Sequence, residues 1–97
     1  MVNAVLIIAH KNKNQLIRLI KSLEDNEFDI FVHIDKKWKI TKEEIVEIKR
    51  ATSHVTVLDK RISGFLDTWS LCQITIELIK KALIKNKNYK YFILLSG

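Results

Sequence analysis

The chain has 97 residues, of which 47% are hydrophobic, with two glycines, no proline and one cysteine. This length and composition predict one folded domain and argue against a disordered or low-complexity chain. No apolar run approaches the roughly 20 residues that span a bilayer, and the N-terminus leads into an expected strand instead of a signal peptide. We therefore expect a soluble, cytoplasmic protein without a transmembrane segment.

The 17 basic and 11 acidic residues leave a net charge of +6. The basic residues are spread along the expected helices, which is typical of a solvated surface; an electropositive rim for a phosphate-bearing ligand is the more specific interpretation. Nucleic acid binding is disfavoured, because aromatic and basic residues do not interleave and no known binding motif occurs. Cys72 has no second cysteine to pair with, and its place in a helical pattern predicts a buried structural thiol.

Two apolar runs each end in a polar cluster before a helical pattern begins. Residues 4–9 predict a strand that is buried on both faces. A helix is expected to start near Asn12, with Gln15 placed to complete a capping box. Residues 29–34, rich in β-branched and aromatic side chains, predict the second strand.

The second half of the chain continues the alternation of helix and strand. Thr41 and Glu44 form the pattern of a capping box at the start of the second helix, and residues 55–58 predict a short third strand. A long helix is expected from Ser70, with residues 91–95 as a fourth, buried strand. The inward stripe of the long helix is expected to consist of Leu71, Ile74, Leu78, Ala82 and Leu83.

The alternation of strands and helices predicts an α/β fold with a parallel sheet of four strands. Right-handed crossovers favour the order 3-2-1-4, with the first strand between the second and the fourth. The fourth strand would then be an apolar edge, and complete proteins cover such edges. We expect a partner, a second copy of the chain or a continuation of the chain to cover it.

Ligands of parallel sheets bind at the carboxyl ends of the strands, where several polar residues of this chain fall. His10 follows the first strand, either as a turn residue or as a group that stacks on a base. Asp35 ends the second strand and is placed to accept hydrogen bonds from ribose hydroxyls or a base N–H. Arg61 follows the third strand as a loop arginine or a phosphate ligand, and His33 is expected to be a packed strand residue.

The start of the long helix has a structural explanation. Ser70 is expected to cap the helix together with Gln73, and Trp69 to pack on Ile74. The sequence contains no glycine-rich phosphate loop, no metal-ligand spacing, no Asp-x-Asp and no GxSxG nucleophile motif. No metal site is expected from these residues.

In order and spacing, five segments together resemble the core-2/I-branching glycosyltransferase family, which includes branching N-acetylglucosaminyltransferases, xylosyltransferases and bacterial relatives. The segments are AVLIIAHKN (4–12), VHIDKK (32–37), Arg61, WSL (69–71) and YFILLSG (91–97). The resemblance implies a Rossmann-like half of a GT-A fold. It also implies transfer of a sugar, such as N-acetylglucosamine or xylose, from a UDP-sugar to a glycan or other hydroxyl acceptor, with inversion and without a metal cofactor.

The resemblance further implies a single N-terminal donor-binding domain over residues 1–97, working near a membrane where glycans are assembled. In this family the catalytic base follows the Ser-Gly that here ends at Gly97, so we expect a truncated portion that cannot transfer sugar alone. Leu66-Asp67-Thr68-Trp69 replaces the Trp-Gly-Gly of many members and is close to the form of others. The donor-binding positions implied are His10, Asp35, Arg61, Trp69, Ser70 and Ser96.

Two other classes of function stay open from the residues alone. One is a small non-enzymatic α/β module that binds a nucleotide, or binds a protein partner through its open sheet edge. The other is a flavodoxin-like or receiver-like domain, although the phosphate loop or acidic cluster of such domains is missing at the strand ends.

Overall fold

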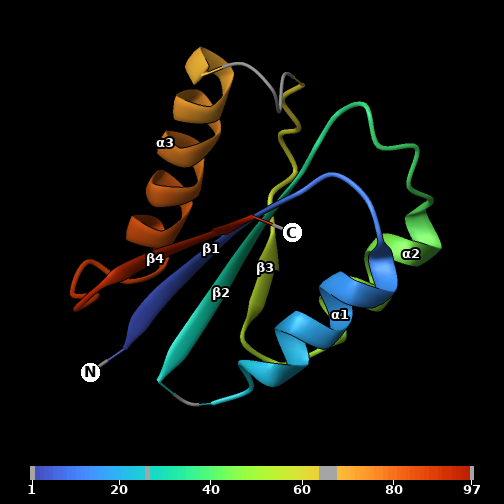
Figure 1. Ribbon diagram of the computed structural model, residues 1–97. Helices are drawn as coiled ribbons and strands as arrows, with labels where there is room; N and C mark the ends of the chain where they lie inside the picture. The colour runs from blue at the N-terminus through green and yellow to red at the C-terminus, as the bar shows by residue number, and fades with distance from the viewer. Residues whose placement is uncertain (1, 26, 64–67, 97) are drawn as a thin grey trace.

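The computed structural model describes residues 2–25, 27–63 and 68–96. Within these ranges the four strands form one parallel sheet in the order β3-β2-β1-β4, as predicted, and the protein is an α/β fold (Figure 1). The elements are β1 (Asn3–Ala9), α1 (Lys13–Ser22), β2 (Phe28–Ile34), α2 (Lys42–Lys49), β3 (Val55–Val57), α3 (Thr68–Lys85) and β4 (Phe92–Ser96).

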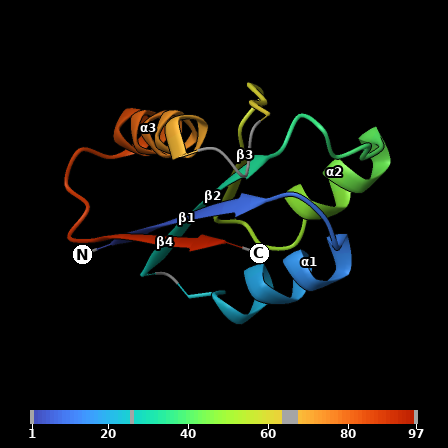
Figure 2. The same cartoon turned by 45° about the horizontal axis from the view of Figure 1, so that its top comes forward.

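The sheet is the middle layer of the molecule, with α3 on one face and α1 and α2 on the other (Figure 2). Because successive side chains of a strand point to opposite faces, β1 contributes to two cores. Val5 and Ile7 pack in the core that contains the buried residues of α1 and α2. Leu6 and Ile8 pack in the core that contains the buried residues of α3. The continuous apolar run of β1 is therefore explained by burial on both sides.

The capping boxes predicted for α1 and α2 have different outcomes. At α2 the Glu44 N–H donates to Thr41 Oγ1 (3.1 Å) and the Thr41 N–H donates to Glu44 Oε1 (3.0 Å), so this capping box is confirmed. These hydrogen bonds lower the pKa of Glu44. At α1 the box does not form, because Asn12 adopts a left-handed backbone (φ 64°) and its side chain donates to Gln15 Oε1 instead. Asparagine tolerates this conformation better than most residues.

The predicted start of α3 is wrong. The helix begins at Thr68, so Ser70 lies inside its first turn instead of at the N-cap position. Trp69 is 71% exposed, and its expected contact with Ile74 stays a prediction. The prediction of a buried thiol is also wrong, since Cys72 is exposed. Helix α3 packs on the sheet through a stripe of side chains that are spaced four residues apart. Side chains two positions away from these, such as that of Cys72, face solvent. The fully buried members of the stripe are Ile74, Leu78 and Ala82.

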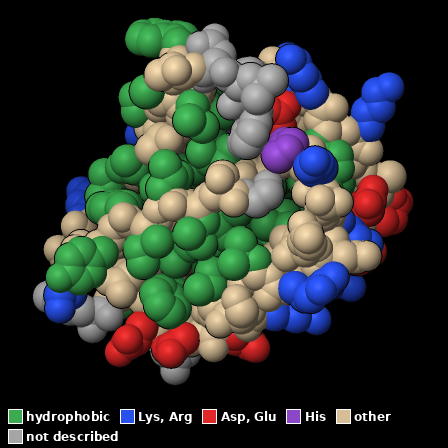
Figure 3. Space-filling model, in the orientation of Figure 1, with side chains coloured by type: hydrophobic (Ala, Val, Ile, Leu, Met, Phe, Trp, Pro, Cys, Tyr) green, Lys and Arg blue, Asp and Glu red, His purple; other side chains and the backbone are tan. Residues whose placement is uncertain are grey.

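β4 is the apolar edge of the sheet. Its strand neighbour among the described residues is β1. The side chains of residues 91–94 are between 38% and 58% exposed, so the expected burial of this strand is wrong while its expected place at the edge is confirmed. Hydrophobic side chains gather over this part of the molecule (Figure 3). What covers the edge stays a prediction.

Tyr89 ties the connection between α3 and β4 to the start of β2. Its hydroxyl donates to Asp29 Oδ2 (2.7 Å), and its ring lies edge-on to Phe31 and Phe92, with centroids 6.2 and 5.8 Å away. Lys85 Nζ lies 3.6 Å from the other Asp29 oxygen. Burial, followed by the hydrogen bond and charge of Asp29, raises the pKa of Tyr89.

We expect Tyr89→Phe to lower the free energy of unfolding by about 1–2 kcal/mol, because the partly buried Asp29 loses a hydrogen bond while the rings stay packed. Urea unfolding measures the change. The control is Tyr91→Phe, which removes a hydroxyl from an exposed ring and should cost less than about 0.5 kcal/mol. Equal losses in the two variants would contradict the role assigned to the Asp29 contact.

Candidate functional site

The carboxyl ends of β1, β2 and β4 bring three of the predicted positions to one edge of the sheet. The Asp35 N–H donates to the Ala9 carbonyl (2.8 Å), so Asp35 follows β2 beside the end of β1, where His10 begins the next loop. Ser96 pairs in register with Ile8 on the other side of β1. This edge is where ligands of parallel sheets bind.

Asp35 organises the loop that follows β2. Its side chain is only 2% exposed, and its Oδ1 accepts a hydrogen bond from the Lys37 N–H (2.7 Å). Its carbonyl accepts from the Trp38 N–H (3.0 Å). An aspartate that bonds to the backbone two residues ahead stabilises a tight turn. One oxygen of the carboxylate is therefore occupied within the protein.

Arg61 reaches from the loop after β3 to the end of β2. Its Nε donates to the Ile34 carbonyl (3.3 Å), and its Nη2 donates to the carbonyls of Asp35 (2.7 Å) and Trp38. The planar guanidinium can serve several acceptors at once, which the ammonium of a lysine cannot do with the same geometry. The structure thus uses this arginine to hold the Asp35 turn, and the expected phosphate contact stays a prediction.

His33, a residue of β2, also links the loop after β2 to the loop after β3. It is fully buried, as expected for a packed strand residue, and its Nε2 accepts a hydrogen bond from the Ile62 N–H (2.9 Å). The Lys36 N–H donates in turn to the Ile62 carbonyl (3.3 Å). The pKa of His33 is lowered chiefly by burial; the Asp35 carboxylate opposes this effect and the Arg61 charge adds to it. The sequence signal for this link is a histidine inside an apolar strand, two residues before the aspartate.

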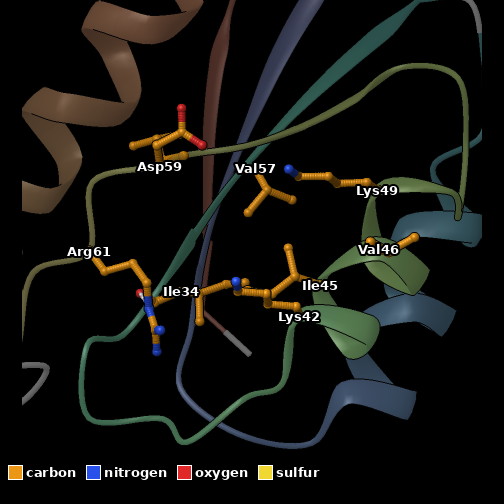
Figure 4. Close-up of a pocket in the computed structure, with 9 residues that line it drawn as sticks. Ile34, Lys42, Ile45, Val46, Lys49, Val57, Asp59 and Arg61 are labelled. Carbon is orange, nitrogen blue, oxygen red and sulfur yellow. Dashed lines mark hydrogen bonds between the residues drawn. The ribbon is translucent and has the colours of Figure 1, made fainter.

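A pocket of about 330 Å³ opens between α2 and the ends of β2 and β3 (Figure 4). Lys42 and Lys49 extend into it from α2, while Arg61 and Asp59 come from the segment after β3. With three cations against one carboxylate, the rim favours an anionic ligand. The apolar walls are Ile34, Ile45, Val46, Val57 and Leu58.

The remaining predicted positions lie on the first turn of α3. Trp69 lines a second pocket of about 380 Å³ together with Ile62, which directly follows Arg61. Ser70 is half-buried beside Trp69 in the same turn. The segment before α3, which includes Leu66 and Asp67, lies outside the described residues.

No three His, Cys, Asp or Glu side chains gather as a metal site within residues 2–25, 27–63 and 68–96. Across the same part of the chain, no helix is long and apolar enough to cross a membrane.

Comparison with known proteins gives one family. The family model described as Core-2/I-Branching enzyme matches residues 4–97, which includes the whole described sheet except Asn3. No curated protein matches the chain significantly.

Proposed function

The chain belongs to the Core-2/I-Branching enzyme family, and from this we propose that it supplies the donor-binding portion of a glycosyltransferase. The family indicates sugar transfer, and parallel sheets of this Rossmann-like kind bind nucleotides at their carboxyl edge. We assign a UDP-sugar as the donor, with N-acetylglucosamine or xylose as the sugar, and a glycan or other hydroxyl compound as the acceptor. The proposed fold is the first half of a GT-A domain, and the proposed donor binding needs no metal.

The observation that carries the proposal is the position of Asp35 at the end of β2, beside the end of β1. We assign the uridine end of the donor to His10 and to the Asp35 oxygen that does not bind the Lys37 amide. Arg61 contributes its positive charge and holds the turn. Trp69, Ser70 and Ser96 are assigned to the lining of the donor site.

In an inverting transfer a carboxylate base takes the proton of the acceptor hydroxyl, whose oxygen attacks the anomeric carbon while the nucleoside diphosphate leaves. Positive groups near the diphosphate stabilise the charge that develops on it. The role proposed for this chain is to bind and orient the donor. No residue of this chain is assigned as the base.

Isothermal titration with UDP and with UDP-N-acetylglucosamine, each with and without magnesium, tests the proposal. We expect binding that does not depend on magnesium and that Asp35→Asn weakens about tenfold, the equivalent of 1.4 kcal/mol. Asparagine keeps an oxygen for the Lys37 amide, so this variant removes the charge and spares the turn. Asp35→Ala should weaken binding further, because the turn is lost as well.

The matched control is Asp25→Asn. Asp25 Oδ1 accepts a hydrogen bond from the Glu27 N–H (3.0 Å), the same local contact as at Asp35, but it precedes β2 at the opposite edge of the sheet. Its affinity for UDP should equal that of the unchanged chain. A folded chain that binds neither nucleotide would contradict the proposal, and equal affinities of Asp35→Asn and the unchanged chain would remove Asp35 from the site.

The exposed edge at β4 favours a second candidate function, a non-enzymatic α/β module that binds a protein partner through this edge. The side chains of residues 91–94 carry no charge that would keep another strand away. The transferase is favoured if UDP binds without magnesium, if Asp35→Asn weakens this binding and if Leu94→Lys leaves it intact. The absence of nucleotide binding by a folded chain favours the module.

A further inference from the structure

Hydrogen bonds join residues 33–38, the end of β2 and the turn after it, to the segment at residues 61–62 in both directions. The Lys36 N–H donates to the Ile62 carbonyl, and the Ile62 N–H donates to His33 Nε2. Arg61 adds its bonds to the carbonyls of Ile34, Asp35 and Trp38. We call His33, Arg61 and Ile62, with these contacts, the clamp. It connects the end of β2 to the segment that follows β3.

The clamp requires a neutral His33. An imidazole nitrogen accepts a hydrogen bond only when it carries no proton, and a protonated histidine presents N–H groups at both ring nitrogens. A protonated Nε2 would therefore place its N–H against the N–H of Ile62, whose nitrogen lies 2.9 Å from Nε2, and two donors form no hydrogen bond. Because Nε2 accepts a hydrogen bond, the neutral ring carries its proton on Nδ1, which is a buried atom.

The surroundings of His33 set the direction of its titration. Its face of β2 is shared with Phe31 and is covered by α3, whose core residues on that side are apolar. The neighbouring β1 places Ile8 beside it, and the titratable His10 follows that strand. Burial and the Arg61 guanidinium disfavour the protonated ring of His33, whereas the Asp35 carboxylate favours it. The net effect is a lowered pKa of His33.

We propose that His33 and Arg61 are positioning residues for the Asp35 turn, and that protonation of His33 opens the clamp and thereby weakens nucleotide binding. The statement on nucleotide binding rests on the proposed function, whereas the opening of the clamp does not. Since the pKa of His33 is lowered on folding, the unfolded chain takes up the proton first. The clamp is therefore complete at neutral pH, and its stabilisation is lost as the pH falls below the ordinary histidine value of about 6.5.

The first test needs no ligand. Hydrogen exchange measured by NMR between pH 7.5 and pH 5 should show the protection of the Ile62 amide falling about tenfold, with the intrinsic exchange rate corrected for pH. The Leu58 amide, which donates to the Val32 carbonyl (2.9 Å), serves as the internal reference and should keep its protection. In His33→Gln, whose side-chain oxygen accepts without titrating, the Ile62 amide should keep its protection as well.

A ratio of Ile62 to Leu58 protection that stays constant with pH in the unchanged chain overturns the clamp, and this result does not depend on the folding of any variant. An equal fall of this ratio in His33→Gln overturns the assignment of the titration to His33.

The second test measures UDP affinity over the same pH range by titration calorimetry. On acidification the UDP affinity of the unchanged chain should fall about fivefold more than that of His33→Gln. Because both proteins bind the same ligand, the comparison cancels the effect of pH on UDP itself. Equal losses overturn the coupling between the clamp and the nucleotide. A chain that binds no UDP at pH 7.5 overturns both the proposed function and this coupling, while the Ile62 amide still decides whether the clamp opens.

Discussion

Arg61→Met is expected to lower the free energy of unfolding by about 3 kcal/mol, because three carbonyls at the end of β2 lose a charged donor. It should also weaken UDP binding, since the Asp35 turn is no longer held. Chemical denaturation measures the first effect and titration calorimetry the second. Methionine retains much of the apolar stem of arginine, so the difference reports mainly on the guanidinium.

Two further variants sharpen this prediction. Arg61→Lys keeps the positive charge but replaces the planar fork, so it should recover little of the stability. Arg18→Met, at an exposed position of α1, should cost less than about 0.5 kcal/mol. If Arg61→Lys were as stable as the unchanged chain, charge alone would explain Arg61 and the hydrogen-bond geometry would have no part.

Phe31→Ala should produce the largest loss of stability, about 3–5 kcal/mol, because it opens a cavity in the core between the sheet and α3. Phe31 is 1% exposed and its ring packs against Tyr89. A loss of this size approaches the whole stability of a small domain, so the variant should melt far below the unchanged chain.

Phe92→Ala is the matched control for this prediction. Its ring packs against the same tyrosine, but it is 42% exposed on the edge strand, so less apolar area is lost on truncation. Thermal melting followed by circular dichroism measures both variants. A loss for Phe92→Ala equal to that of Phe31→Ala would mean that the edge strand is buried in solution, for instance by a second copy of the chain.

The fold could be predicted because its signals are local. Residues 4–9 of the first strand are apolar throughout, which indicates burial on both faces and hence a central position. Thr41 and Glu44 lie three residues apart, the spacing that a capping box needs. The order of the strands then followed from the handedness of the crossovers.

The site was predicted less completely. His10, Asp35 and Ser96 could be placed at the carboxyl edge, because the end of a strand is visible in the sequence. The role of Arg61 in holding the turn could not be predicted, because its acceptors are backbone carbonyls up to 27 residues away. Every residue has such a carbonyl, so the sequence does not indicate which ones accept. The exposure of Cys72 was also missed, since a helical stripe of apolar residues does not reveal which neighbouring positions meet the sheet.

The sequence by itself determined the alternation of strands and helices, the parallel sheet and its order, and the polar residues at the strand ends. These depend on periodicity and on short-range spacing, which neighbouring residues carry. Only the tertiary structure decided that His33 is a hydrogen-bond acceptor for Ile62 and that Arg61 holds the turn of Asp35. Such contacts arise when two loops distant in the chain meet above neighbouring strands, because buried polar atoms take the partners that the packed fold brings to them.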